Sequence, residues 1–197
     1  MVSFFVDAVL FDMDGTLVDS TPGVIKAWTS FAADEKYEHL QLDSLISATH
    51  GVRLVESLHR WFNITDPDEL QAESKRFEEE VIAGGPVILP GVELLLQQLA
   101  DLPNAGVDPK WTIPAPDPYL EGAKRCNADP TRTLVVEDAP SGIRSGRAAG
   151  AKTLAVLTSH TEEEMLASGV EPDYIVRDLS HVSVRWAGGK IQITISS

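Results

Sequence analysis

The chain has little cysteine, few basic residues and no long apolar run. Its single cysteine, Cys126, excludes an internal disulfide and any zinc site made of several cysteines, and it suits a reducing compartment such as the cytoplasm. Its 16 Lys and Arg face 30 Asp and Glu, so the net charge is −14. This balance argues against nucleic-acid binding, which needs clustered basic side chains. No segment approaches the roughly 18 apolar residues of a membrane span.

The remaining composition is that of a folded protein. With 43% hydrophobic and 23% charged residues in 197, the chain can form one domain with a decoration, or two small domains. The apolar run at Phe4–Val6 is broken by Asp7 and has no basic flank, so we expect no signal peptide. We therefore expect a cytoplasmic monomer that binds neither nucleic acid nor membranes.

Apolar runs and helix signals alternate through the outer parts of the chain. Four buried parallel strands are predicted, at 8–11, 133–136, 152–158 and 174–176. The helices between them begin at Asp117-Pro118, at Pro140 and at Thr161, where Glu164 completes a capping box. This alternation predicts an α/β fold with a doubly wound parallel sheet. The tail alternates at Ile191, Ile193 and Ile195, as an exposed strand does.

The segment that follows the first strand is different in character. Residues 22 to about 84 are predicted to be helical, with one helix starting at Pro22 and another at Asp66-Pro67. A helical insertion of roughly 65 residues thus interrupts the sheet domain. The predicted domains are a core of 1–18 and 87–197, and a helical cap of 19–86.

Four carboxylates are predicted at one edge of the sheet. Asp12 and Asp14 follow the first strand, and Glu137 and Asp138 follow the strand predicted at 133–136. Ligands of such sheets bind beyond the carboxyl ends of the strands. Like charges this close need a cation, and an all-oxygen ligand set with open positions suits Mg²⁺. A carboxylate at a strand end can attack phosphorus, and a second one two residues later can act as general acid and base.

The loop residues Gly15 and Thr16 extend this prediction. A glycine turn allows backbone N–H groups to face a phosphate, and Thr16 adds a hydroxyl donor. An Asp-x-Asp-Gly-Thr loop directly after a buried strand is a specific signal for phosphate chemistry.

The sequence resembles a known family at these positions. FDMDGTLVDS is similar to the first motif of the haloacid dehalogenase-like phosphatases, and LVVEDAPSGI to their acidic fourth motif. THGVRLVESL, DPYLEGAKR, AGAKTLAVLT and DYIVRDLSHVSV resemble fungal 2-deoxyglucose-6-phosphate and glycerol-phosphate phosphatases. The resemblance covers nearly the whole chain, and it implies a Mg²⁺-dependent phosphatase of a small sugar or polyol phosphate.

The resemblance also implies a role for each matching residue. Asp12 would be the nucleophile and Asp14 the general acid and base. The magnesium ligands would be a carboxylate oxygen of Asp12, the backbone carbonyl of Asp14 and the carboxylate of Asp138, with Glu137 close by. True dehalogenases of the superfamily lack the second aspartate, so Asp14 favours phosphoryl chemistry.

The cap is expected to reach the substrate through one loop. By the same resemblance, that loop carries His50, Gly51 and Arg53. Arg53 would hold a sugar hydroxyl or a phosphate oxygen; the alternative is a surface arginine at the start of a helix.

The pattern breaks between Gly91 and Asp117. The family places a Ser or Thr after its second strand and a Lys before Pro-x-Pro-Asp-Pro-Tyr. In this chain a short predicted strand, 111–113, runs directly into Pro114. Ile113 therefore occupies the position of the family's lysine. A β-α-β piece at the sheet edge is therefore missing, through an internal deletion, a skipped exon or a gene-model error. Thr112 could replace the missing Ser or Thr hydroxyl, and Lys110 could replace the missing lysine amine. We expect exposed apolar surface at 86–90 and on the next helix.

Three functional hypotheses follow. The first is the phosphatase, impaired by the deletion. The second is a catalytically inactive truncated form that still folds, and the third is a sugar phosphomutase on the same scaffold. The sequence does not name the phosphate ester.

Overall fold

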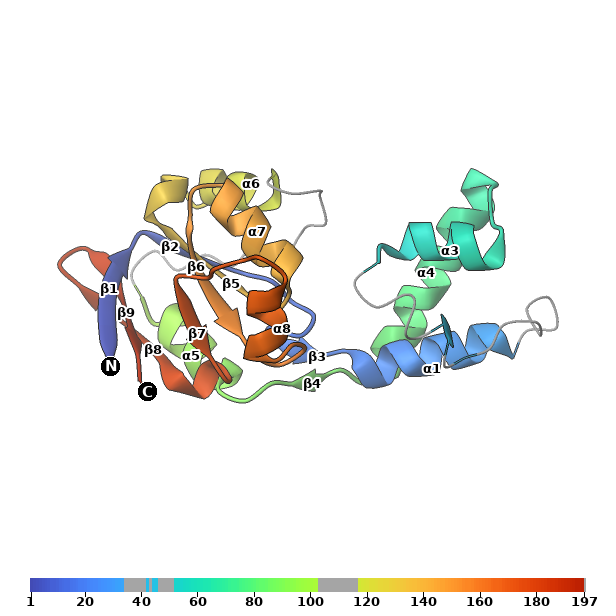
Figure 1. Ribbon diagram of the computed structural model, residues 1–197, viewed down its shortest axis with the longest axis horizontal. Helices are drawn as coiled ribbons and strands as arrows, with labels where there is room; N and C mark the ends of the chain where they lie inside the picture. The colour runs from blue at the N-terminus through green and yellow to red at the C-terminus, as the bar shows by residue number, and fades with distance from the viewer. Residues whose placement is uncertain (34–41, 43, 46–51, 103–116, 197) are drawn as a thin grey trace. The chain divides into compact units, whose positions relative to one another are not determined.

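The computed structural model describes residues 1–33, 42, 44–45, 52–102 and 117–196 (Figure 1). The chain divides into two compact units, Met1–Val18 with Ile88–Ser197, and Asp19–Val87. The chain passes between the units through β3 (Val18–Asp19) and β4 (Val87–Ile88), which pair with each other.

The first unit contains a four-stranded parallel sheet. Its strands are β2 (Ala8–Phe11), β5 (Thr133–Glu137), β6 (Lys152–Val156) and β7 (Tyr174–Val176), in the order β2-β5-β6-β7. The four predicted strands are thus confirmed, although β6 ends two residues early because the chain turns at Leu157. All five residues of β5 are buried, which explains the continuous apolar run in the sequence.

Helices cover both faces of this sheet. On one face lie α6 (Asp117–Arg125), α7 (Pro140–Ala148) and α8 (Glu162–Ala167), and on the other lies α5 (Val92–Ala100). Side chains of β5 alternate between the two faces of the sheet. Leu134 and Val136 pack in the same hydrophobic cluster as residues of α5, and Val135 packs in the same cluster as a residue of α6. The α/β fold is confirmed, and so is the capping box of Thr161 at the start of α8.

A second, antiparallel sheet lies in the same unit. It consists of β1 (Val2–Val6), β9 (Lys190–Ile195) and β8 (Val182–Ala187), in the order β1-β9-β8. The prediction of an exposed tail strand is wrong, because β9 is the central strand and Ile193 is 0% exposed. Ile193 pairs with Phe4 and Val184 across the sheet and packs on the main core. This pairing joins the two ends of the chain (Figure 1).

The second unit is helical. Its described helices include α1 (Thr21–Ala32), α3 (Leu54–Phe62) and α4 (Pro67–Ala83). Its core is aromatic, with Trp28 stacked on Phe62 and Phe31 set edge-on to Phe77. Asp66 caps α4 as predicted, because its carboxylate accepts the first free N–H groups of the helix. Among the described residues, no helix is long and apolar enough to cross a membrane.

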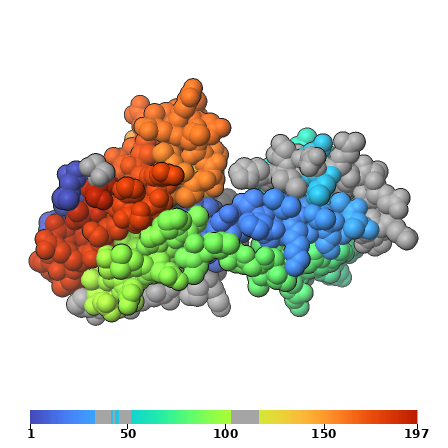
Figure 2. Space-filling model, turned by 90° about the horizontal axis from the view of Figure 1, so that it is seen from below, coloured from blue at the N-terminus to red at the C-terminus, as the bar shows by residue number. Residues whose placement is uncertain are grey.

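The predicted exposed apolar surface is present where the chain returns to the first unit. Val87 is 57% and Leu94 61% exposed, and Ile88 and Leu96 are exposed as well. Figure 2 shows this green stretch at the surface. Within the described part of the chain, β2 has a strand partner on one edge only, namely β5. The predicted strand at 111–113 and the junction at Pro114 lie outside the described residues.

Short 3₁₀ helices complete the first unit. Pro130–Arg132 leads directly into β5, and Leu179–His181 leads into β8. In each case an aspartate side chain caps the turn, Asp129 in the first and Asp178 in the second. The entrances of both strands are therefore set by local hydrogen bonds.

Candidate active site

The loop after β2 is a tight turn closed by its own backbone. The Asp12 N–H still donates to the Val136 carbonyl at 3.0 Å, which places Asp12 at the end of the parallel ladder. Beyond it, Leu17 and Val18 both donate to the Met13 carbonyl, and the Gly15 N–H donates to the Val18 carbonyl at 2.7 Å. The N–H groups of these three residues are therefore used inside the loop.

Gly15 is required at its position for two reasons. Its φ is +88°, a conformation that side chains with a Cβ rarely adopt. A Cβ there would also lie 2.2 Å from Asp138 Oδ2 and 2.6 Å from Ser159 Oγ. The β2 loop thus passes directly against Asp138, so the glycine brings the two acidic segments together.

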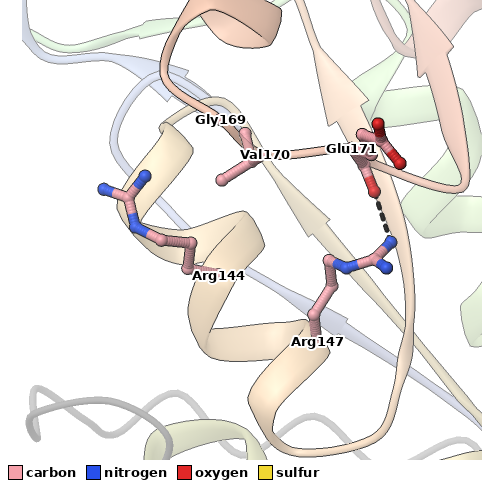
Figure 3. Close-up of a pocket in the computed structure, with 5 residues that line it drawn as sticks. All are labelled: Arg144, Arg147, Gly169, Val170 and Glu171. Atoms are coloured by element: carbon pink, nitrogen blue, oxygen red, sulfur yellow. Dashed lines mark hydrogen bonds between the residues drawn. The ribbon is translucent and has the colours of Figure 1, made fainter.

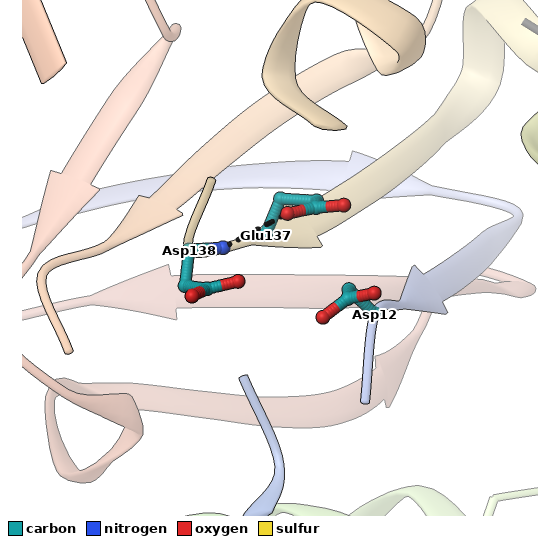
Figure 4. A group of neighbouring side chains, drawn as sticks. All are labelled: Asp12, Glu137 and Asp138. Carbon is teal, nitrogen blue, oxygen red and sulfur yellow. Dashed lines mark hydrogen bonds between the residues drawn. The ribbon is translucent and has the colours of Figure 1, made fainter. Parts of the chain in front are cut away.

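Three carboxylates meet at the carboxyl edge of the sheet (Figure 4). Asp12 follows β2, while Glu137 and Asp138 stand at the end of the neighbouring β5, and one oxygen from each lies within 4.8 Å of the others. The Thr16 hydroxyl, which is buried, donates to Asp138 Oδ1 at 3.4 Å. These four residues, chosen from the sequence, are therefore brought together.

Asp14 is placed differently from the other acids. Its side chain is exposed, and its carboxylate is not part of the group formed by Asp12, Glu137 and Asp138. Its backbone bridges to Val18 within the turn. The sequence assigns the carbonyl of Asp14 to the metal and its carboxylate to proton transfer, and both assignments stay predictions.

Glu137 is held by donors on both of its oxygens. The Tyr119 hydroxyl donates to Oε1 at 2.8 Å, and the N–H groups of Asp138 and Ala139 each donate to Oε2 at 3.1 Å. The side chain lies over Gly142 in α7, where a Cβ would come within 1.7 Å of Oε1. The absence of a side chain at Gly142 thus leaves room for this carboxylate.

Burial and repulsion perturb the acids of this group. Burial, reinforced by the charge of Asp138, raises the pKa of Asp12 to about 6, although a hydrogen bond from Met13 N–H offsets part of the shift. Burial and then the charge of Asp12 raise the pKa of Glu137 to about 8. Burial, with the charge of Glu137, also raises the pKa of Tyr119, so its hydroxyl remains a donor.

No lysine or arginine of the described residues forms an ion pair with these carboxylates. The ion pairs of the described residues lie elsewhere, for example between Arg76 and Glu80 in α4. Buried carboxylates with raised pKa values, and without a lysine or arginine partner in the described part of the chain, fit a bound cation, and an all-oxygen set fits Mg²⁺.

The described residues do not test the predicted cap residues. His50 and Gly51 lie outside the described residues. Arg53 belongs to the second unit, precedes α3, pairs with Glu56 and keeps a side chain that is 73% exposed. Its substrate-binding role remains a prediction.

Sequence reasoning missed three residues that contact the site. Tyr119 reaches Glu137 from α6, and Thr158 and His160 reach Gly15 and Asp138 from the loop after β6. The same edge rule that selected Asp12 and Asp138 applies to the end of β6, so it could have found the last two.

A pocket in the first unit is separate from the acid group. It lies between α7 and the segment after α8, and is lined by Arg144, Arg147, Gly169, Val170 and Glu171 (Figure 3). Arg147 donates to the Glu171 carbonyl and Arg144 to the Ser168 carbonyl. Both arginines thus satisfy backbone oxygens beyond α8.

The acids lie at the carboxyl edge of a parallel α/β sheet, and a helical unit is inserted after the first strand of that sheet, an arrangement that indicates a class of α/β hydrolases. Residues 6–107 match the family model of haloacid dehalogenase-like hydrolases, and residues 113–182 match a second model of the same group, HAD-hydrolase-like. The chain therefore belongs to the haloacid dehalogenase-like hydrolases.

Three similar proteins are phosphatases or phosphohydrolases by name. The chain is 33% identical to hexitol phosphatase A of Escherichia coli K12, over 75% of this chain and 81% of the relative. It is 28% identical to glycerol-1-phosphate phosphohydrolase 2 of Saccharomyces cerevisiae (95% and 87%), and 27% identical to 2-deoxyglucose-6-phosphate phosphatase 1 of the same yeast (93% and 92%). The resemblance to such phosphatases is confirmed.

Solved structures agree on the fold. A family IA hydrolase of Entamoeba histolytica superposes with a TM-score of 0.74 at 20% identity, over 89% of this chain and 95% of that one. β-Phosphoglucomutase of Clostridium difficile superposes with a TM-score of 0.64 at 19% identity, over 89% and 92%. At these identities the likeness concerns the fold alone.

Proposed function

We propose that this chain is a Mg²⁺-dependent phosphomonoesterase for a small sugar or polyol phosphate. The observation that carries the proposal is the group of Asp12, Glu137 and Asp138, which has no basic partner among the described residues and lies at the edge where such sheets bind ligands. The names of the E. coli and yeast relatives support the substrate class. We propose a cytoplasmic monomer that binds no nucleic acid.

In this proposal Asp12 is the nucleophile. Its carboxylate oxygen attacks phosphorus, the bond to the ester oxygen breaks, and an aspartyl-phosphate forms. The exposed Asp14 donates a proton to the leaving alcohol and then takes one from the water that hydrolyses the intermediate. With a pKa of about 6, the carboxyl group of Asp12 is ionised at neutral pH and can act as nucleophile.

The same residues would hold the cation. Asp12 and Asp138 would supply carboxylate oxygens and Asp14 its carbonyl, with Glu137 alongside. When bound, Mg²⁺ supplies positive charge that offsets both the carboxylates and the substrate phosphate. Thr16, held on Asp138, and the loop at Gly15 would shape the phosphate side of the site.

We further propose that an internal deletion lowers the rate. The two family models meet at residues 107–113, and the alignment with the yeast phosphohydrolase spans 229 positions, more than the 197 residues of this chain. Together with the unpaired edge of β2 in the described residues, this supports the loss of a β-α-β piece. Loss of a preorganised donor costs about 10²–10³ in rate, so the loss of two reduces activity severely.

The second candidate is a folded form without turnover. The absence of a basic partner at the acids, within the described residues, favours it, because none of those residues adds positive charge to that of the cation in holding a phosphate.

One assay separates these functions. Phosphate release is measured from glycerol 1-phosphate, 2-deoxyglucose 6-phosphate and a hexitol phosphate, with Mg²⁺ and with EDTA. We expect slow release that EDTA and Asp12→Asn both abolish. Unchanged release by Asp12→Asn would refute the mechanism, whereas no release by folded protein that binds Mg²⁺ would establish the inactive form. Isomerised sugar phosphate without free phosphate would indicate a mutase.

A further inference from the structure

We propose that the loop Thr158–His160, between β6 and α8, positions the two acidic segments for a divalent cation. Its residues touch the backbone of both segments without contributing a carboxylate. This inference rests on the proposed cation site, and it assigns a positioning role to Thr158 and His160.

The first contact is with the loop after β2. The Thr158 hydroxyl donates to the carbonyl oxygen of Gly15. That carbonyl belongs to the residue directly after Asp14, whose own carbonyl is the proposed ligand. Because neighbouring peptide planes share a Cα, a hydrogen bond on the Gly15 carbonyl restricts the direction in which the Asp14 carbonyl points.

The second contact is with the segment after β5. His160 Nδ1 lies 3.2 Å from the Asp138 carbonyl oxygen. A carbonyl only accepts hydrogen bonds, so Nδ1 must carry the proton and donate it. The bond fixes the backbone of the residue whose carboxylate belongs to the acid group.

The packing leaves the two segments little freedom. A Cβ at Gly15 would lie 2.2 Å from Asp138 Oδ2 and 2.6 Å from Ser159 Oγ, so the β2 loop lies against Asp138 and against Ser159. Loop 158–160 is itself fixed at both ends. Before it Val156 is buried in β6, and after it the capping box of Thr161 opens α8.

These tethers oppose the repulsion within the acid group. Asp12 and Asp138 lie on separate strands and repel each other before a cation binds, so each segment tends to move away from the other. Bonds from a third, anchored loop keep the oxygens near the arrangement that a cation needs. Outer partners of metal ligands change affinity by about 10- to 100-fold when they are removed.

The test measures the affinity of the metal-free protein for Mn²⁺ by electron paramagnetic resonance, without substrate. Thr158→Val and His160→Ala should each raise the Kd for Mn²⁺ about tenfold. Thr158→Ser and His160→Asn keep a donor at the same place, and their Kd should return to within about threefold of the wild-type value.

A matched control separates positioning from stability. Asp66→Ala removes the cap of α4 in the other unit and should lower the melting temperature while leaving the Kd for Mn²⁺ unchanged. If Thr158→Val and His160→Ala bind Mn²⁺ with the wild-type Kd, the positioning role is refuted and the proposed function stands. If the wild-type chain binds no Mn²⁺, or if Asp138→Asn binds it equally well, both proposals fall together.

Discussion

Asp12→Asn should stabilise the metal-free protein at pH 8, although it removes the proposed nucleophile. Burial and the charge of Asp138 raise the pKa of Asp12 from 3.8 to about 6 in the folded state. The folded chain therefore binds a proton at Asp12 more tightly than the unfolded chain does. Ionisation of Asp12 costs folding free energy, and an asparagine of the same shape does not ionise.

The sign and size of this effect follow from the two pKa values. Below about pH 4 Asp12 is protonated in both states, and its ionisation costs nothing. The cost grows as the pH rises from about 4 to about 6, and it is complete above that range. A shift of roughly two pKa units corresponds to about 3 kcal/mol. The free energy of unfolding of Asp12→Asn should thus exceed that of the wild type by a small amount at pH 4 and by about 3 kcal/mol at pH 8.

Urea denaturation in EDTA at pH 4, 6 and 8 measures this difference. Glu171→Gln, which replaces an exposed carboxylate in the loop before β7, is the matched control for a single Glu/Asp-to-amide change. The reasoning is refuted if Asp12→Asn is no more stable than the wild type at pH 8, or if its advantage is the same at pH 4. Added Mg²⁺ should reduce the advantage, because the cation stabilises the ionised wild-type site.

Three further outcomes are expected. Tyr119→Phe leaves Glu137 Oε1 without its donor and should lower the free energy of unfolding by about 1–3 kcal/mol in urea, a loss that an unchanged midpoint would contradict. Gly15→Ala should lower the melting temperature more than Gly85→Ala, which has a similar φ but open space around it; equal losses would show that Asp138 does not crowd Gly15. Because protons compete for Asp12 and Glu137, Mg²⁺ should raise the melting temperature more at pH 8 than at pH 6, and calorimetry showing the reverse order would exclude this site.

The parallel sheet was predictable because its signal is local. A strand covered on both faces needs apolar residues in succession, and Ala8–Phe11 and Thr133–Glu137 show such runs. Helix starts were predictable for the same reason, since Asp66 and Thr161 cap helices with their own side chains. These elements are determined by residues within a few positions of each other.

The antiparallel sheet was not predictable in this way. Ile193 lies opposite Phe4, almost the full length of the chain away, so neither segment alone indicates that it has a partner. An alternating pattern describes an exposed strand and a half-buried one equally well until the partner is known. Burial of Ile193 is therefore a consequence of a long-range pairing.

The acid group was predictable from topology, while its support was not. Asp12 and Asp138 follow neighbouring parallel strands, so the edge rule brings them together without any knowledge of side chains. Tyr119 reaches Glu137 from a helix, and His160 reaches a backbone carbonyl. The edge rule places His160 near the site but does not predict its hydrogen bond, which depends on packing geometry, and Tyr119 carries no sequence pattern at all.

Phosphate binding should depend strictly on the cation. At this edge the described residues supply carboxylates with no lysine or arginine paired to them, so a phosphate anion approaching Asp12 or Asp138 meets repelling negative charge. Titration of inorganic phosphate by calorimetry should give heat with Mg²⁺ present and none in EDTA. Binding in EDTA would mean that a basic side chain reaches the site, and Lys110→Ala would then test the substitute suggested by the sequence. If that variant removed the binding, the chain would retain the positive charge that its family supplies through a lysine, and the proposed loss of rate would have to be revised.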